Sequence, residues 1–176
     1  MPWKNGGGFT EEITRDSGEG LDGFGWRLSI ADIEESGGFS TFAGYQRIIT
    51  VLQGDGMRLL VDGQPSRPLL PFDAFAFGGE SQVSCKLLGG AIRDFNLIYA
   101  PQRYRARLQW LDGTSRLYSS ASTVLLFAAS SQVEVGIAGR EAQRLGLHDC
   151  LRLEGNDELL GLDVQGRCCL IELISR

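Results

Sequence analysis

The chain has 176 residues, of which 43% are hydrophobic and 22% charged, and its net charge is −5. This length suits one domain or two small fused ones with a buried core, and no apolar run approaches the roughly 18 to 20 residues that cross a bilayer. The acidic balance argues against a nucleic-acid partner, because neutralising phosphates needs a concentrated basic surface. The opening MPWKNGGG is not a secretory signal, so we expect a cytoplasmic protein without membrane contact.

From about residue 24 onward, short runs of β-branched, aromatic and aliphatic residues alternate with glycine-containing turns. This pattern predicts an antiparallel β sandwich or barrel. The dipeptides Asp62-Gly63 and Asp112-Gly113 are typical of tight hairpins, which need positive φ angles. The predicted strands cover residues 26–33, 47–52, 57–61, 83–88, 92–99, 104–110, 123–128, 133–137, 150–153, 159–164 and 168–174.

The chain also carries a weak internal repeat. Shifting it by 76 residues, the interval from Gly63 to Gly139, places predicted strands on predicted strands and aligns several turn glycines. Phe72 then falls on His148. Two strand meanders of similar length can also align by chance, and this alternative stays open. Taken at face value, the repeat indicates two related β modules.

The two halves differ in one group of positions. In the last strand of each half, Arg93, Asp94 and Asn96 match Cys169, Leu170 and Glu172. The first half therefore keeps polar groups where the second is mostly apolar. Buried polar and charged groups must be paired or hydrogen-bonded, so this cluster indicates either an internal network or a ligand pocket.

Several motifs resemble the HutD/Ves family, and they cover residues 2–97 well. The motifs are MPWKNGGGFTEEI, WRLSIA from Trp26, GFSTFAG from Gly38, PFD from Pro71, and LGG through RDFN from Leu88 to Asn96. The resemblance implies an all-β, double-stranded β-helix bicupin without metal or other cofactor, and a role linked to histidine utilisation. We expect an N-terminal cupin-like module with the pocket at residues 1–100 and a structural one at 101–176, packed as one compact unit. Family members carry some ten residues ahead of the Pro-Trp-Lys-Asn motif, so an N-terminal strand is expected to be missing or disordered here, which leaves Trp3, Lys4 and Asn5 less firmly held.

The single histidine argues against both a cupin metal centre and a serine hydrolase. A cupin metal centre takes two or three histidines and a glutamate, whereas His148 is the only histidine in the sequence. A serine hydrolase would need a histidine near a nucleophile, and Ser29 lies in the other module. His148 itself is either a satisfied side chain beside Asp149 or a general base.

The candidate site combines arginines for a carboxylate with smaller polar groups that orient the ligand. Arg27 and Ser29 share one face of their strand, and Asp94 and Asn96 share a face of theirs, whereas Arg93 points with Phe95. Alternatively, Arg27 or Arg93 pairs internally with Asp94 or Asp73, and the glycine-rich start is only a flexible lead-in. The predicted ligand-binding residues are Lys4, Asn5, Trp26, Arg27, Ser29, Arg47, Arg93, Asp94, Phe95 and Asn96.

These observations predict a binding protein without catalytic residues. Its expected partner is a small anionic metabolite, a histidine-degradation intermediate of the urocanate or formylglutamate type, with a regulatory consequence. The rival function is a cofactor-independent isomerase or hydrolase that uses Asp94 or Lys4 as acid–base group. A third is an interaction protein with a vestigial pocket. The sequence is compatible with a homodimer but does not determine the oligomeric state.

Overall fold

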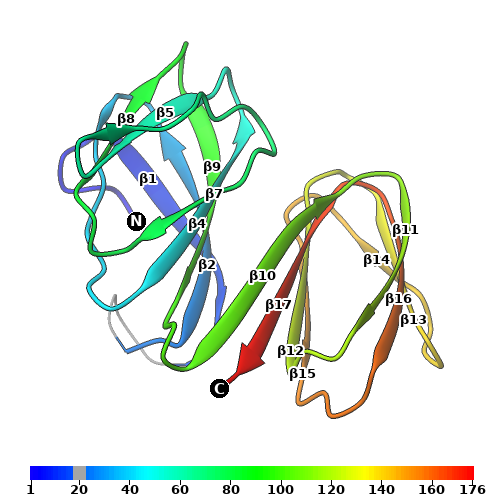
Figure 1. Cartoon of the computed structure of the whole chain (residues 1–176). Helices are drawn as coiled ribbons and strands as arrows, with labels where there is room; N and C mark the ends of the chain where they lie inside the picture. Colours follow the sequence, from blue (N-terminus) through cyan, green and yellow to red (C-terminus); the bar gives the residue numbers. More distant parts are fainter. Residues whose placement is uncertain (18–22) are drawn as a thin grey trace. The chain divides into compact units, whose positions relative to one another are not determined.

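A computed structural model describes residues 1–17 and 23–176, and all regular elements in this part of the chain are β-strands (Figure 1). Contacts divide the chain into two compact units, Met1–Pro101 and Gln102–Arg176. Each strand predicted from the sequence is present, with both ends within one residue of their expected positions. Within the described residues, no helix has the length and hydrophobicity needed to cross a membrane.

The first unit consists of two antiparallel sheets. In spatial order, one contains β1 (Gly8–Arg15), β2 (Trp26–Ile33), β9 (Ile92–Tyr99), β4 (Gln46–Gln53) and β7 (Phe75–Gly78). The other contains β3 (Gly37–Gly38), β8 (Val83–Leu87), β5 (Met57–Val61) and β6 (Gln64–Pro65). Ile33 and Val51 of the first sheet belong to the same buried apolar cluster as Met57 and Leu59 of the second. The core of the unit therefore lies between its two sheets.

The second unit has the same construction. One sheet contains β10 (Tyr104–Leu111), β17 (Cys168–Ser175), β12 (Thr123–Ala128) and β15 (Cys150–Glu154). The other contains β11 (Thr114–Ser119), β16 (Leu160–Gln165), β13 (Val133–Ile137) and β14 (Gln143–Leu145). Leu126 and Leu170 from the first sheet pack with Val135 and Val164 from the second.

Strand order shows that the two units are related modules. The order β2-β9-β4-β7 corresponds to β10-β17-β12-β15, and β3-β8-β5-β6 corresponds to β11-β16-β13-β14. Strand β1 is the one element of the first unit without a counterpart among the described residues of the second. The predicted fold, an all-β bicupin of two cupin-like modules, is confirmed.

Backbone geometry supports the 76-residue repeat independently. Gly63 and Gly139 have φ angles of 80° and 76° in the turns that follow β5 and β13. Phe72 and His148 also match, with φ angles of 65° and 67°, an uncommon conformation for residues with a Cβ atom. The amide of Phe72 donates to the Val51 carbonyl, and that of His148 donates to the Ala128 carbonyl. The 76-residue repeat is therefore confirmed, and it extends to the strained backbone of Phe72 and His148.

Several strands were not predicted. Strands β1 and β11 are sheet edges with alternating polar side chains, so their composition gives little apolar signal. The prediction of a tight hairpin at Asp112-Gly113 was wrong. Gly113 does have a positive φ of 78°, but it connects β10 in one sheet to β11 in the other. A corner between sheets needs the same backbone conformation as a hairpin, and the dipeptide does not distinguish them.

Replacing Gly56 with alanine should destabilise the first unit. Gly56 has a φ of 96°, and an added Cβ would lie 2.5 Å from the carbonyl oxygen of Leu69. Gly90→Ala is the matched control, because no atom lies within 4 Å of its Cβ position. We expect Gly56→Ala to lower the free energy of unfolding by about 1–3 kcal/mol and Gly90→Ala to leave it nearly unchanged, as measured by urea denaturation. Equal midpoints for the two variants would contradict the turn assignment.

Candidate functional site

The polar cluster of the first unit lies on the inner face of the central strands β2, β9 and β4. Residues directly opposite each other in antiparallel strands share a face. Asn96 lies opposite Ser29, and Asp94 lies opposite Ala31 and Val51. Because Ala31 and Val51 belong to the core between the two sheets, Asp94 and Asn96 also point into that interior.

Arg47 of β4 reaches the same interior and is only 6% exposed. Its Nη2 donates to Asn96 Oδ1 at 2.9 Å and its Nη1 to the Ser40 carbonyl at 3.2 Å, whereas its Nε has no hydrogen-bond partner. Burial lowers the pKa of Arg47 to about 10, against the attraction of Asp94, so the guanidinium stays charged at neutral pH. Three aromatic rings lie 5.1 to 5.5 Å from its Cζ atom, those of Phe39, Phe42 and Phe77.

Asp94 is the most deeply buried acidic group of the cluster, with 1% of its surface exposed. Its Oδ1 accepts a hydrogen bond from Asn96 Nδ2 at 3.3 Å, and its Oδ2 has no partner. Burial raises the pKa of Asp94 to about 7, although Arg47 and the hydrogen bond from Asn96 act in the opposite direction. At neutral pH this carboxyl can therefore exchange a proton with little cost.

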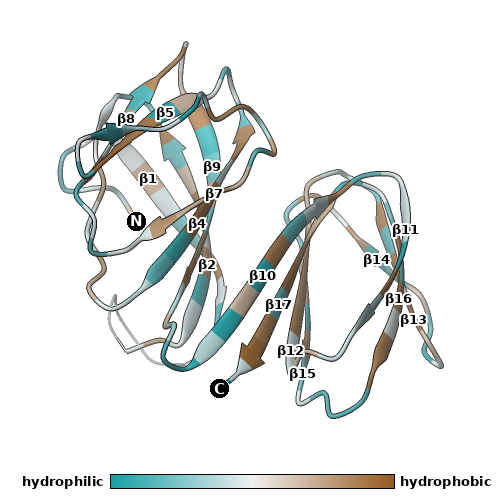
Figure 2. Cartoon of the chain, viewed as in Figure 1, coloured by the Kyte–Doolittle hydropathy of each residue, from teal (hydrophilic) through white to brown (hydrophobic). Residues whose placement is uncertain are grey.

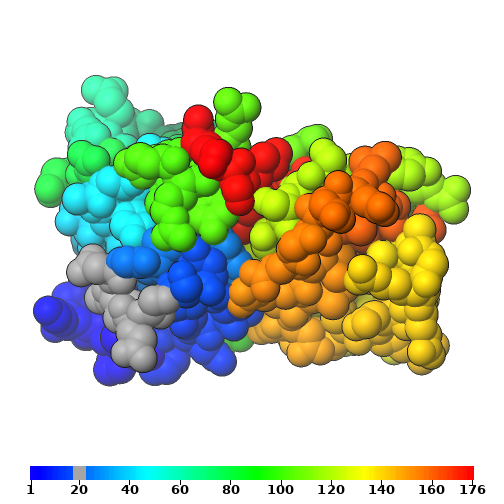
Figure 3. Space-filling model, turned by 90° about the horizontal axis from the view of Figure 1, so that it is seen from below, coloured from blue at the N-terminus to red at the C-terminus, as the bar shows by residue number. Residues whose placement is uncertain are grey.

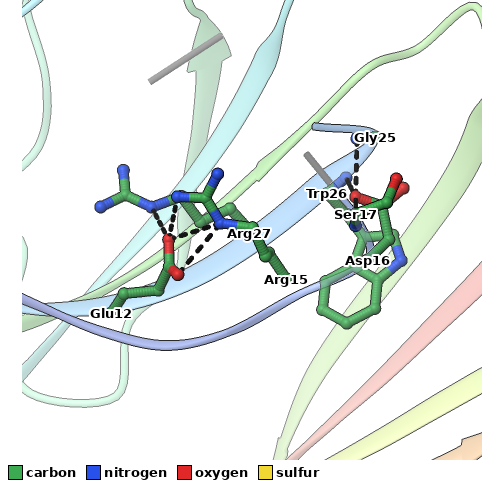
Figure 4. A network of polar contacts seen from close by, with 7 residues as sticks. All are labelled: Glu12, Arg15, Asp16, Ser17, Gly25, Trp26 and Arg27. Carbon is green, nitrogen blue, oxygen red and sulfur yellow. Dashed lines mark hydrogen bonds and ion pairs between the residues drawn. The ribbon is translucent and has the colours of Figure 1, made fainter. Parts of the chain in front are cut away.

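Arg27 points into the same face and is held by a residue that the sequence did not single out. Its Nε donates to Glu12 Oε1 at 2.6 Å, and Glu12 also accepts hydrogen bonds from Arg15, so one carboxylate lies between two guanidinium groups (Figure 4). The bond from Arg15, and after it the bond from Arg27, lowers the pKa of Glu12 against the effect of burial. A groove of about 400 Å³ runs along this edge, lined by Met1, Phe9, Thr10, Glu11, Glu12, Arg15 and Arg27. The N-terminal segment that contributes to it lies on the surface of the unit (deep blue in Figure 3).

The structure does not bring Trp26, Arg93 and Phe95 to this cluster. They lie on the opposite face of the sheet, because side chains alternate along β2 and β9. Arg93 pairs there with Asp32, its Nε donating to Oδ1 at 2.7 Å, and both side chains are partly exposed. The internal partner of Arg93 is thus neither Asp94 nor Asp73, and the partner of Asp73 is Arg67.

The glycine-rich start packs through Trp3 more than through its polar residues. Lys4 and Asn5 are exposed, and Asn5 Oδ1 accepts a hydrogen bond from the Gly7 amide at 3.0 Å. Trp3 Nε1 donates to Thr10 Oγ1 at 2.7 Å, so this indole is held by the start of β1. A Cβ atom at Gly8 would lie 2.7 Å from the Asp32 carbonyl oxygen, which accounts for glycine at this close approach between strands.

The residues that surround Arg27 and Arg47 were not predicted from the sequence. Glu12 belongs to the MPWKNGGGFTEEI motif, but its strand was not predicted, and the irregular register between Glu12 and Thr14 breaks the alternation that would place its side chain on one face. Phe39 and Phe42 lie in the quoted segment from Gly38 to Gly44. No local periodicity connects them to Arg47, since their contact depends on tertiary packing.

In the second unit, other side chains of the protein pair with the polar group at the position equivalent to Asn96. Glu172, which matches Asn96, accepts a hydrogen bond from Ser119 Oγ at 2.6 Å and lies 3.7 Å from Arg107 Nε. Figure 2 shows polar bands on β9, whereas β17 is mostly hydrophobic.

The ring of His148 stacks on Phe127, with ring centroids 5.6 Å apart, which favours a structural role for this histidine over a role as a general base. A larger cavity of about 670 Å³ in this unit, lined by Asp112, Gly113, Ser131, Gln132, Val133, Glu134, Arg144, Leu145, Gly146, Gln165 and Gly166, contains none of the predicted site residues.

Two cupin-like modules, one of which retains a buried polar cluster, define this protein as a bicupin. The family model described as HutD matches residues 1–170. The chain therefore belongs to the HutD family, which is linked to histidine utilisation, as the resemblance predicted.

Comparisons with individual proteins support the assignment to the HutD family. The chain is 95% identical over 176 residues to the 21.2 kDa protein of the hutC 3′ region of Pseudomonas putida, covering all of this chain and 93% of that protein. It is 65% identical to HutD from Pseudomonas fluorescens SBW25, whose structure superposes with a TM-score of 0.90 over 100% of this chain and 93% of that chain. Protein Ves from Escherichia fergusonii is 34% identical over 130 residues, 70% of this chain and 64% of that protein.

A stoichiometric transition metal is not expected in the purified protein. Residues 1–17 and 23–176 contain no group of three or more histidine, cysteine, aspartate or glutamate side chains placed to hold a metal ion. Elemental analysis after dialysis should therefore find far less than one zinc, iron, manganese or nickel per chain. One equivalent that survives dialysis would contradict this prediction.

Asp94 should make stability depend on pH in a defined window. Its pKa rises from 3.8 to about 7 on folding, so between these values the folded state binds the proton that the unfolded state has released. The free energy of unfolding contributed by this group is therefore highest below pH 4, falls as the pH rises to about 7, and is constant above. Asp94→Asn should show a flatter profile than the wild type in urea titrations between pH 4.5 and 8. Parallel profiles would show that Asp94 titrates normally.

Proposed function

We propose that the interior of the first unit binds a small carboxylate metabolite, and that binding regulates histidine utilisation. The expected ligands are histidine-degradation intermediates such as urocanate or N-formylglutamate. The observation that carries the proposal is the state of Arg47, a buried and charged guanidinium whose Nε–H has no acceptor. Native proteins rarely leave such a donor unsatisfied, and a carboxylate would supply both the acceptor and the negative charge.

The other contacts of Arg47 support an anionic ligand. Its two hydrogen bonds end on neutral oxygens, those of Ser40 and Asn96. Its ionisable neighbour Asp94 has a raised pKa and is only partly ionised at pH 7. The positive charge of Arg47 is therefore incompletely neutralised by the protein.

A conformational consequence of binding follows from how Arg47 is covered. Phe39 and Phe42 pack against its guanidinium, and the Phe42 amide is bonded to the Gly79 carbonyl at 2.7 Å. A ligand that reaches Arg47 must displace these rings or close them over itself. A binding protein with this property can report a metabolite to a partner without any chemical step.

A cofactor-independent enzyme is the second candidate, and the pKa of Asp94 near 7 favours it. A buried carboxyl that gains and loses a proton at neutral pH has the property of a general acid–base group. Proton NMR of urocanate or N-formylglutamate incubated with the protein separates the two functions. Unchanged chemical identity of the ligand over many hours argues against catalysis, whereas product signals that require Asp94 would establish it.

Replacing Arg47 with methionine should weaken ligand binding, while the same change at Arg93 should not. Arg93 lies in the adjacent strand but points to the opposite face, so it is a matched control. We expect Arg47→Met to reduce affinity for urocanate or N-formylglutamate about ten- to a hundredfold, the scale of a charge-assisted hydrogen bond. Calorimetric titration well below the unfolding temperature measures this on folded protein, with circular dichroism as the check. Equal affinities of both variants and the wild type would contradict the site.

A further inference from the structure

Two buried polar atoms face the interior of the first unit without a hydrogen-bond partner, and they have opposite character. Arg47 Nε is a donor, and Asp94 Oδ2 is an acceptor while the carboxyl is ionised. Asn96 lies between the two side chains: its Oδ1 accepts from Arg47 and its Nδ2 donates to Asp94. This row of side chains therefore has a cation, Arg47, at one end and a carboxyl group, Asp94, at the other.

The strand register explains this separation. Arg47 lies opposite Ile98, whereas Asp94 is four residues away along β9, which is about 13 Å at the rise of an antiparallel strand. The long side chain of Arg47 covers part of this interval to reach Asn96. Arg47 and Asp94 thus bond to the two ends of the Asn96 amide group, and a ligand that contacts both of them must lie alongside this amide.

We propose that Asp94 selects ligands that carry an N–H donor in addition to their carboxylate. This inference rests on the proposed function, because it assumes that Arg47 binds the carboxylate. The ligand's carboxylate accepts from Arg47 Nε–H, and a ring or amide N–H at its other end donates to Asp94 Oδ2. The chemical class is that of imidazolyl and amido carboxylic acids.

The same arrangement disfavours dicarboxylates that lack an N–H group to place against Asp94, whereas the amide of N-formylglutamate supplies one. A second ligand carboxylate placed at the far end would meet the Asp94 carboxyl in a buried setting, where like charges repel strongly. The second unit offers a natural comparison, since it has Leu170 at the position of Asp94 and no such acceptor there. The acidic residue is therefore a specificity determinant that only the first module retains.

A pair of ligands that differ in their ring heteroatoms tests this proposal. Urocanate and 3-(3-furyl)acrylate have similar shape and the same carboxylate, but the furan ring has neither the N–H donor nor the second ring nitrogen of urocanate. Calorimetric titration at pH 8 compares them on the wild type, Asp94→Asn and Asp94→Leu, the last copying the residue of the second unit. Asp32→Asn is the control, because Asp32 lies on the opposite face of β2.

We expect the wild type to bind urocanate at least about tenfold more tightly than furylacrylate, the scale of one hydrogen bond to a charged group. Both Asp94 variants should bring the two affinities within about twofold of each other by weakening urocanate, and Asp32→Asn should keep the wild-type ratio. Equal affinities on the wild type, or a ratio that both Asp94 variants preserve, would overturn the role of Asp94 and leave carboxylate binding intact. Failure of both compounds to bind the wild type would instead overturn the proposed function and with it this inference.

Discussion

The guanidinium of Arg47 lies inside a β sandwich, among three phenylalanine rings, and one of its N–H groups has no acceptor. Removing a cation from water costs several kcal/mol unless partners compensate for the lost solvation. Asn96, Ser40 and the aromatic faces compensate in part, since cation–π contacts of desolvated arginines contribute about 2 kcal/mol or more. Asp94 and the loop that contains Phe39 and Phe42 are arranged around this one charge.

The second module shows what the same scaffold looks like when the protein satisfies its own polar group. Glu172 has a short hydrogen bond from Ser119 and an ion-pair partner in Arg107, and its neighbours Cys168 and Leu170 are apolar. In the first module the equivalent strand leaves Asp94 Oδ2 without a partner. A purely structural network would be expected to resemble the second module. The contrast supports a ligand as the component that completes the first.

The sequence predicted the fold well because turn glycines and short apolar runs are local signals. Strand β2 has the bounds predicted for it, and the repeat was visible from Gly63 and Gly139. The inner polar groups Asp94 and Asn96 could also be predicted, since alternation along a strand determines which residues share a face. Alternation likewise places Arg93 on the opposite face of β9 from Asp94 and Asn96.

Other parts of the site depend on contacts between residues distant in the chain, and no local pattern reveals them. The pairing of Arg27 with Glu12 depends on strand β1. This edge strand is polar, so its sequence gives little sign that it is a strand. The rings around Arg47 come from a loop and from β7. Burial, which shifts the pKa values of Arg47 and Asp94, is also a property of the folded chain alone.

The Nε–H of Arg47 offers the most direct test that the interior of the first unit is a carboxylate site. Its resonance can be assigned in a proton–nitrogen NMR spectrum by its loss in Arg47→Lys and followed during titration with urocanate. If a carboxylate accepts this hydrogen bond, the proton should shift downfield in a saturable manner and exchange more slowly with water. A resonance that stays in place while the ligand is shown by calorimetry to bind would contradict the account, because the ligand would then occupy another part of the molecule.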